Sequence, residues 1–207
     1  AGMIEDATYE AWGADGVFQR ALANGPAWEH LDFNLDPADD RYVFFDDVRV
    51  RQAVAYAIDR QEIIDELFFG VGEVPVTYIP PEHPMFTDTL KTYPYSPTLA
   101  SDLLTQAGWI DSDGDGIRDK NGQPLAFLLT TTDAARRVQT GAMIEEDLAA
   151  IGIDLTVDAR SALEVFRDGP DGPLFGRKFD TGEFAWITGG EPPCDLYVSN
   201  NIPTPDN

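Results

Sequence analysis

The sequence predicts an α/β fold, in which strands alternate with helices in layers around a core. A helix is expected over 96–107, where Ser-Pro supplies an N-cap and a preset first turn. The segment PLAFLLTTT, residues 124–132, is short and almost entirely apolar, which is typical of a strand buried on both faces. A second helix over 133–151 ends at a glycine and leads straight into the alternating strand 153–157.

The first expected element is a half-buried strand in WEHLDFNL, since Leu31, Phe33 and Leu35 occupy alternate positions. Asp36-Pro37 closes that strand. The later segment VPVTYIPPEHPMF, residues 74–86, predicts a strand that leads into a loop, because each proline pushes the preceding residue out of the helical region.

Two consecutive short helices are expected next to the first strand. DVRVRQAVAYAI carries apolar residues on one helical face behind an N-cap at Asp46 or Asp47. The second helix begins at Asp59, with Glu62 at the spacing of a capping box, and Gly70 is placed to end it.

The remaining elements follow from caps and apolar runs. Asp133 is predicted to cap the long helix, and Ser161 with Glu164 forms the pattern of a capping box before a short one. FAWIT, residues 184–188, is expected to be the last buried strand.

Composition restricts the function. The chain has 207 residues with 43% apolar content, and its 14 basic and 37 acidic residues give a net charge of −23. This charge repels nucleic acid and anionic membrane surfaces, so neither is an expected partner. Cys194 is the single cysteine, which rules out an intrachain disulfide and a cysteine zinc cluster, and we expect it to be a small buried residue. Membrane insertion is not expected, because no apolar run approaches the roughly 20 residues of a spanning helix.

The stretch DSDGDGIRDKNG, residues 111–122, suggests a calcium loop, because alternate acidic side chains project into one pocket while Gly116 permits a sharp turn. The candidate metal ligands are Asp111, Asp113, Asp115, the carbonyl of Ile117 and, through water, Asp119. Gly122 stands where an EF-hand has its bidentate glutamate, and the expected flanks are helix and strand rather than two helices. The alternative is a helix-to-strand connector whose aspartates and glycines serve turn geometry. If calcium binds, its expected role is structural.

Three segments together resemble the second lobe of family 5 bacterial extracellular solute-binding proteins, the peptide and nickel receptors of ABC importers. They are DDVRVRQAVAYAIDRQEIIDELFFGVGEV, YPYSPTLASDLLTQAGW and IGIDLTV. The resemblance implies a lobe like those of type II periplasmic binding proteins, a mixed sheet flanked by helices, over 28–207. Residues 1–27 would be a lead-in from the adjoining part of a longer receptor, whose first lobe and C-terminal return are not in this chain.

The resemblance also implies a function: binding of a peptide or similar polar solute between two lobes, outside the cytoplasm, and delivery to ABC permease subunits. Family peptide receptors often have an aspartate for the peptide ammonium where this chain has Gly189, and Glu191 or Asp195 could replace it. Trp186 would line the cleft or pack in the core, and the two glycines would let ligand backbone approach or only form a turn. The candidate ligand-binding residues are Trp186, Gly189, Gly190, Glu191, Asp195 and Tyr197.

Two other classes of function are compared with the sequence features. A calcium-stabilised extracellular surface or adhesion module is the alternative, because the chain has the aspartate loop and a strong negative charge. Enzymatic activity is not expected, because the sequence contains no G-x-S-x-G, P-loop, H-E-x-x-H or dinucleotide fingerprint.

Overall fold

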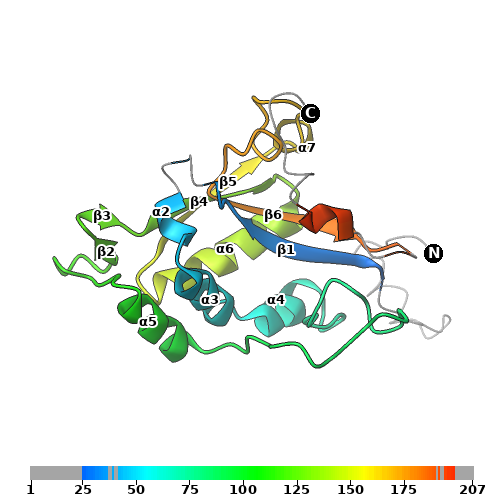
Figure 1. The fold of residues 1–207 in the computed structure, drawn as a ribbon, viewed down its shortest axis with the longest axis horizontal. Coiled ribbons are helices and arrows are strands. Elements are labelled where there is room, and N and C mark those ends of the chain that lie inside the picture. The colour runs from blue at the N-terminus through cyan, green and yellow to red at the C-terminus, as the bar shows by residue number, and fades with distance from the viewer. Residues whose placement is uncertain (1–24, 37–38, 40–41, 190, 192–193, 199–207) are drawn as a thin grey trace, which may run out of the picture.

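The structure, a computed structural model, describes residues 25–36, 39, 42–189, 191 and 194–198. Its centre is a four-stranded sheet with strand order β1-β6-β4-β5 (Figure 1). The strands are β1 (Ala27–Phe33), β4 (Ala126–Thr132), β5 (Asp154–Arg160) and β6 (Thr181–Ile187). β4 runs parallel to β5 and β6, whereas β1 pairs with β6 in the antiparallel direction. The predicted α/β class and mixed sheet are confirmed.

Helices cover one face of this sheet and form the main core with it. They are α2 (Tyr42–Phe45), α3 (Val48–Ala57), α4 (Arg60–Leu67), α5 (Pro97–Gln106) and α6 (Ala135–Ala149). Val54 of α3, Leu104 of α5 and Leu148 of α6 are buried in one apolar cluster with Phe127 and Leu129 of β4. Their apolar surface leaves water together, which is the main favourable contribution to folding of this layer.

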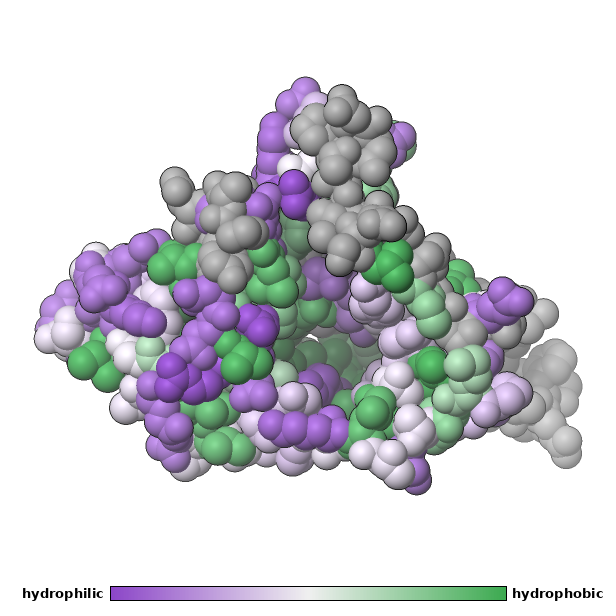
Figure 2. All heavy atoms as spheres, viewed as in Figure 1, coloured by the Kyte–Doolittle hydropathy of each residue, from purple (hydrophilic) through white to green (hydrophobic). Residues whose placement is uncertain are grey.

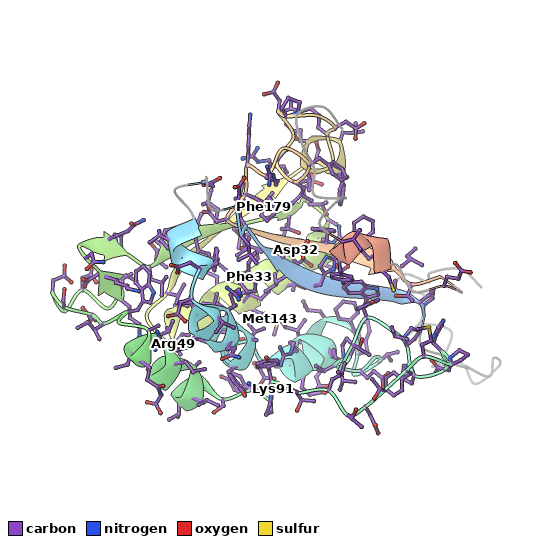
Figure 3. All side chains as sticks on the ribbon, viewed as in Figure 1. Asp32, Phe33, Arg49, Lys91, Met143 and Phe179 are labelled. Atoms are coloured by element: carbon purple, nitrogen blue, oxygen red, sulfur yellow. The ribbon has the colours of Figure 1, made fainter. Side chains whose placement is uncertain are left out.

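A hollow interrupts the helical layer. Figure 2 shows it on the near face, with hydrophobic residues in its depth. Phe33 of β1 and Met143 of α6, labelled in the middle of the same view in Figure 3, are both only partly buried against the core.

The opposite face of the sheet carries a smaller core. Helix α7 (Ala162–Val165) and the loop that follows it place Val165 and Leu174 over Phe184 of β6, with Phe179 packed beside them. This cover reaches Phe184 but leaves the carboxyl end of β6 open, as the burial of the strand shows: its exposed positions begin at Trp186.

Most of the predicted helix starts are confirmed. The side chains of Asp47, Asp59 and Ser96 each accept a hydrogen bond from a backbone N–H in the first turn of α3, α4 and α5. At α7, Ser161 and Glu164 form a complete capping box. These caps satisfy backbone donors that have no partner within the helix.

Four local predictions were wrong. Asp133 is not a cap: the N-cap of α6 is Ala134, which makes no side-chain capping bond, and the Asp133 N–H instead donates to the carbonyl of Arg160 at 2.7 Å. Leu35 lies beyond β1 and is exposed. Residues 74–86 form no strand, since their prolines remove donors that a ladder needs. β6 is buried only over its first half, and its last two residues, Trp186 and Ile187, are exposed.

One arginine joins the ends of α5 and α6 to the aspartate loop. Arg118 donates hydrogen bonds to the carbonyls of Ile151 at 2.7 Å and Trp109 at 2.8 Å, and to the hydroxyls of Ser101 and Thr105. Gly152, with φ +83°, passes so close that an added Cβ would lie 2.9 Å from Arg118 Cγ. The planar guanidinium supplies several donors in a fixed geometry that lysine cannot reproduce.

Arg118→Ala should lower the free energy of unfolding by about 2–3 kcal/mol, because it leaves half-buried carbonyls without their charged donor. Lys178→Ala is the control: its exposed ion pair with Asp171 should contribute less than about 1 kcal/mol. Urea denaturation of both variants measures the difference. Equal losses would show that Arg118 does not hold these segments together.

Candidate functional site

The carboxyl end of β6 opens to solvent. Trp186 is 36% exposed and Ile187 is 67% exposed, although the first four residues of the strand are buried. In open α/β sheets, ligands bind beyond the carboxyl ends of the parallel strands. The predicted site residue Trp186 therefore lies where a ligand can reach it.

Aromatic side chains line this face because β1 and β6 pair in one particular register. Trp28 pairs with Trp186, and His30 pairs with Phe184. The ring centroid of His30 lies 4.5 Å from those of both Trp28 and Phe184, and that of Phe184 lies 5.7 Å from that of Trp186. These distances are typical of favourable ring contacts, so the aromatic face is packed as one unit.

Two tyrosines extend the aromatic face beyond the sheet. The Tyr78 ring centroid lies 5.7 Å from that of Trp28 and 5.1 Å from that of Tyr197, which belongs to the short helix η1 (Cys194–Tyr197). Thr188 ties the three segments together, because its hydroxyl accepts from Trp28 Nε1 at 3.0 Å and donates to the Tyr78 carbonyl at 2.5 Å. Burial raises the pKa of both tyrosine hydroxyls, which therefore stay neutral and can donate hydrogen bonds.

Polar groups border the aromatic face on the β1 side. Asp32 follows Trp28 and His30 at alternate positions, so all three point to the same side of the sheet. The Asp32 carboxylate is half exposed and lies 3.6 Å from His30 Nε2, and it acts electrostatically on Tyr197. Among the described residues, His30 Nδ1 has no hydrogen-bond partner. The face thus offers a half-exposed carboxylate next to aromatic rings, whereas His30 Nδ1 is buried.

The other predicted ligand-binding residues are only partly described. Gly189 and Glu191 are exposed directly after β6, and the atom nearest to a Cβ added at Gly189 is the Glu191 carbonyl oxygen, at 3.9 Å. Gly190 lies outside the described residues, and only the backbone of Asp195 is described. Cys194 is a free, exposed cysteine, so the prediction that it is buried was wrong. Its side chain is a hydrogen-bond partner of Tyr78.

Sequence reasoning missed Trp28, Asp32 and Tyr78. For the two β1 residues a signal was present: if Leu31 and Phe33 face the core, then Trp28, His30 and Asp32 must face the other way. Tyr78 gave no local signal, since its position depends on a contact with Thr188, 110 residues away.

The aspartate loop forms a separate cluster at the other end of the molecule. One carboxylate oxygen from each of Asp111, Asp113 and Asp115 comes within 4.8 Å of the others, and all three side chains are exposed. Oxygens in such an arrangement suit a hard cation. The same carboxylates also accept hydrogen bonds from backbone N–H groups of the loop, as a turn would require. For example, the Gly114 N–H donates to Asp111 Oδ1 at 2.7 Å.

The remaining predicted metal ligands are placed differently. Ile117 and Asp119 line a cavity of about 260 Å³ together with Asp113 and Asp115. The carboxylate of Asp119 accepts from the N–H and the hydroxyl of Ser112, which lowers its pKa. A minimal hairpin of β2 (Asp119–Lys120) and β3 (Gln123–Pro124) then leads into β4, so the flanks are helix and strand, as predicted.

Comparison with known proteins identifies the family. The model for bacterial extracellular solute-binding proteins, family 5 Middle, matches residues 4–206. The chain belongs to this family. The match begins at residue 4, upstream of Trp28, the residue at which the predicted lobe begins. Because the family consists of solute-binding proteins, the expectation that the chain is not an enzyme is confirmed.

The relatives include receptors for different ligands. The oligopeptide-binding protein AppA of Bacillus subtilis is 35% identical over 56% of this chain and 22% of its own length. The nickel-binding periplasmic protein of Escherichia coli is 34% identical over 63% of this chain and 26% of its own length. This chain therefore spans about a quarter of the length of these relatives.

A solved structure supports the same fold. The oligopeptide-binding protein of Thermus thermophilus, crystallised with a pentapeptide, matches 81% of this chain and 29% of its own, with 28% identity and a TM-score of 0.73. The predicted type II periplasmic-binding-protein architecture is confirmed. In the part of the chain that the structure describes, no helix is both long and apolar enough to cross a membrane.

Calcium in the aspartate loop stays a prediction. Calcium added to the protein after a chelator has removed bound metal should raise its melting temperature, because a ligand that binds only the folded state stabilises that state by mass action. Asp113→Asn with Asp115→Asn should abolish the shift, whereas Asp88→Asn, in an exposed loop elsewhere, should keep it. The absence of a shift at millimolar calcium would leave the loop as a connector only.

Proposed function

We propose that this chain forms one lobe of a two-lobed receptor that captures a peptide or a similarly sized polar solute for an ABC importer. Residues 28–207 form the lobe, and residues 1–27 lead in from the adjoining part of the receptor. The open carboxyl end of β6, with Trp186 presented beside Trp28 and Tyr78, is the observation that supports this function most directly. Hinge closure of a second lobe over this face would bury the solute without chemistry.

The aromatic face suits a ligand with varied side chains. Flat rings provide a large contact area at low conformational cost and tolerate different partners. The bare backbone at Gly189 leaves room for the main chain of a ligand. Among the relatives, a peptide receptor and a nickel receptor share this fold, so the fold alone does not select the ligand.

A carboxylate on this face would bind a cationic group of the ligand. Glu191 and Asp195 remain the candidates from sequence, and Asp32 joins them because it borders the aromatic face. The gain from such a pair increases when lobe closure removes water and lowers the effective dielectric. The overall charge of −23 favours the approach of cationic solutes.

The partners and location follow from this function. ABC permease subunits would receive the solute from the closed receptor, which would work outside the cytoplasm and be held at the membrane by parts beyond this lobe. Membership of an extracellular solute-binding family supports this proposal. The comparisons do not support the alternative of an adhesion module.

The full-length receptor should carry its solute through purification. Gentle denaturation followed by mass spectrometry should release a series of short peptides. A single metal chelate or sugar would keep the two-lobed receptor and contradict the peptide assignment. Capture of a macromolecule by the isolated lobe would contradict the receptor proposal itself.

Trp186→Ala should weaken binding of the identified solute by about 2 kcal/mol, roughly thirtyfold, because it removes a ring from the centre of the contact. Leu163→Ala is the matched control, since Leu163 is 88% exposed on α7 and should not touch the solute. Titration calorimetry on the full-length receptor measures both. Unchanged affinity for the tryptophan variant would place the ligand elsewhere.

Asp32→Asn and Glu191→Gln distinguish the two described carboxylates. The variant that removes the true anchor should lose affinity for peptides with a free ammonium group, and should retain affinity for the same peptides acetylated at that group. Comparable loss for both forms of the peptide would show that neither carboxylate binds the ammonium.

A further inference from the structure

The side-chain carboxyl group of Glu183 is buried on one face of β6, the strand that also carries Trp186. Glu183 lies three residues before Trp186 on β6, pairs with Leu31 of β1 and faces the helical side of the sheet. It is only 4% exposed. A buried carboxylate is costly unless it is neutralised or well paired, so its surroundings decide its state.

The two hydrogen-bond contacts between Thr131 and Glu183 are best satisfied if the Glu183 carboxyl group carries a proton. Thr131 Oγ1 lies 3.0 Å from the backbone carbonyl oxygen of Glu183 and also bonds to Glu183 Oε2. A hydroxyl carries one hydrogen, so it can donate a full, well-aligned hydrogen bond to only one of these oxygens. If Glu183 is protonated, its O–H donates to Thr131 Oγ1 while the Thr131 hydroxyl donates to the carbonyl, and both contacts are satisfied.

The nearby cation is engaged mainly by other groups. Arg137, in the first turn of α6, lies 3.1 Å from Glu29 Oε1 on β1 and donates to Thr132 Oγ1 on β4 at 3.0 Å. Its Nε lies 3.8 Å from Glu183 Oε1, beyond hydrogen-bond distance. The charged groups that interact with Glu183 are therefore Glu29 and Arg137. Burial, with a contribution from the negative charge of Glu29, raises the pKa of Glu183 to about 7.

We propose that Glu183 holds a proton in the folded protein and is a pH-sensitive positioning residue for the open end of β6. When the proton leaves, Thr131 can satisfy only one of its two acceptors, and the new carboxylate competes with Glu29 for Arg137. The contacts that fix β6 against β4 and α6 then weaken beneath Trp186. The effect on solute binding rests on the proposed function, whereas the protonation itself does not.

The direction of the pH effect follows from the raised pKa. Between the ordinary value of 4.5 and the folded value of about 7, the folded protein holds a proton that the unfolded chain has released. Stability therefore decreases as pH rises through this interval, and this contribution is fully present only below it.

Melting temperatures of the ligand-free chain test the protonation. The melting temperature of the wild-type chain should fall between about pH 5 and pH 8 by more than that of Glu183→Gln. The glutamine amide donates a hydrogen bond as the protonated acid does, but it does not titrate. Glu66→Gln, at an exposed position on α4, should keep the wild-type pH dependence. Glu29→Gln should move the midpoint to lower pH, because it removes a like charge and frees Arg137 for Glu183.

Hydrogen exchange of the β6 amides, corrected for intrinsic rates, tests the positioning. Residues 185–187 should exchange faster above pH 7 in the wild-type chain and should show no such step in Glu183→Gln. Identical pH dependence of melting in the wild-type and Glu183→Gln chains would overturn the protonation. A wild-type exchange profile without the step would overturn the positioning role. Both measurements are made without solute, so their failure is distinct from failure of the proposed receptor function.

Discussion

The antiparallel pairing of β1 with β6 is the interaction on which the rest of this structure depends. It joins residues 27–33 to residues 181–187, which lie at opposite ends of the described chain. Side chains along a strand point alternately to the two faces of the sheet, so a slip of the register by one residue would move every side chain to the other face. Pairing of Trp28 with Trp186 and of Leu31 with Glu183 therefore determines both the aromatic face and the position of the buried carboxyl group.

The two faces of this pair serve different purposes. On one face, aromatic rings pack against each other and against Tyr78, and they remain partly open where the cover of α7 ends. On the other face, Leu31 and Phe33 pack against the main core, and Glu183 shares that side with Arg137. A single strand thus connects the exposed Trp186 to a buried titratable group three residues away, which is the basis of the coupling that we propose between them.

Local sequence signals predicted the parts of the fold that neighbouring residues control. The caps at Asp47, Ser96 and Ser161 depend on bonds within one turn, and they form as expected. The failures occurred where distant segments decide. Asp133 directs its N–H to Arg160 on β5 instead of capping α6, and residues 74–86 have no partner strand although their extended pattern suggested one. In the candidate site, Trp186 could be named from sequence, but its exposure depends on where the cover of α7 ends.

The sequence by itself determined the α/β class, most of the helix starts, the acidic character and the resemblance to solute-binding receptors, because periodicity, capping residues and composition are properties of short segments. Only the tertiary structure decided which side chains meet across long separations. It brought Tyr78 to Thr188, aligned Asp32 with the aromatic face and placed Thr131 against Glu183. The physical reason is that strand register and layer packing are set by the burial of all segments together, which no local window contains.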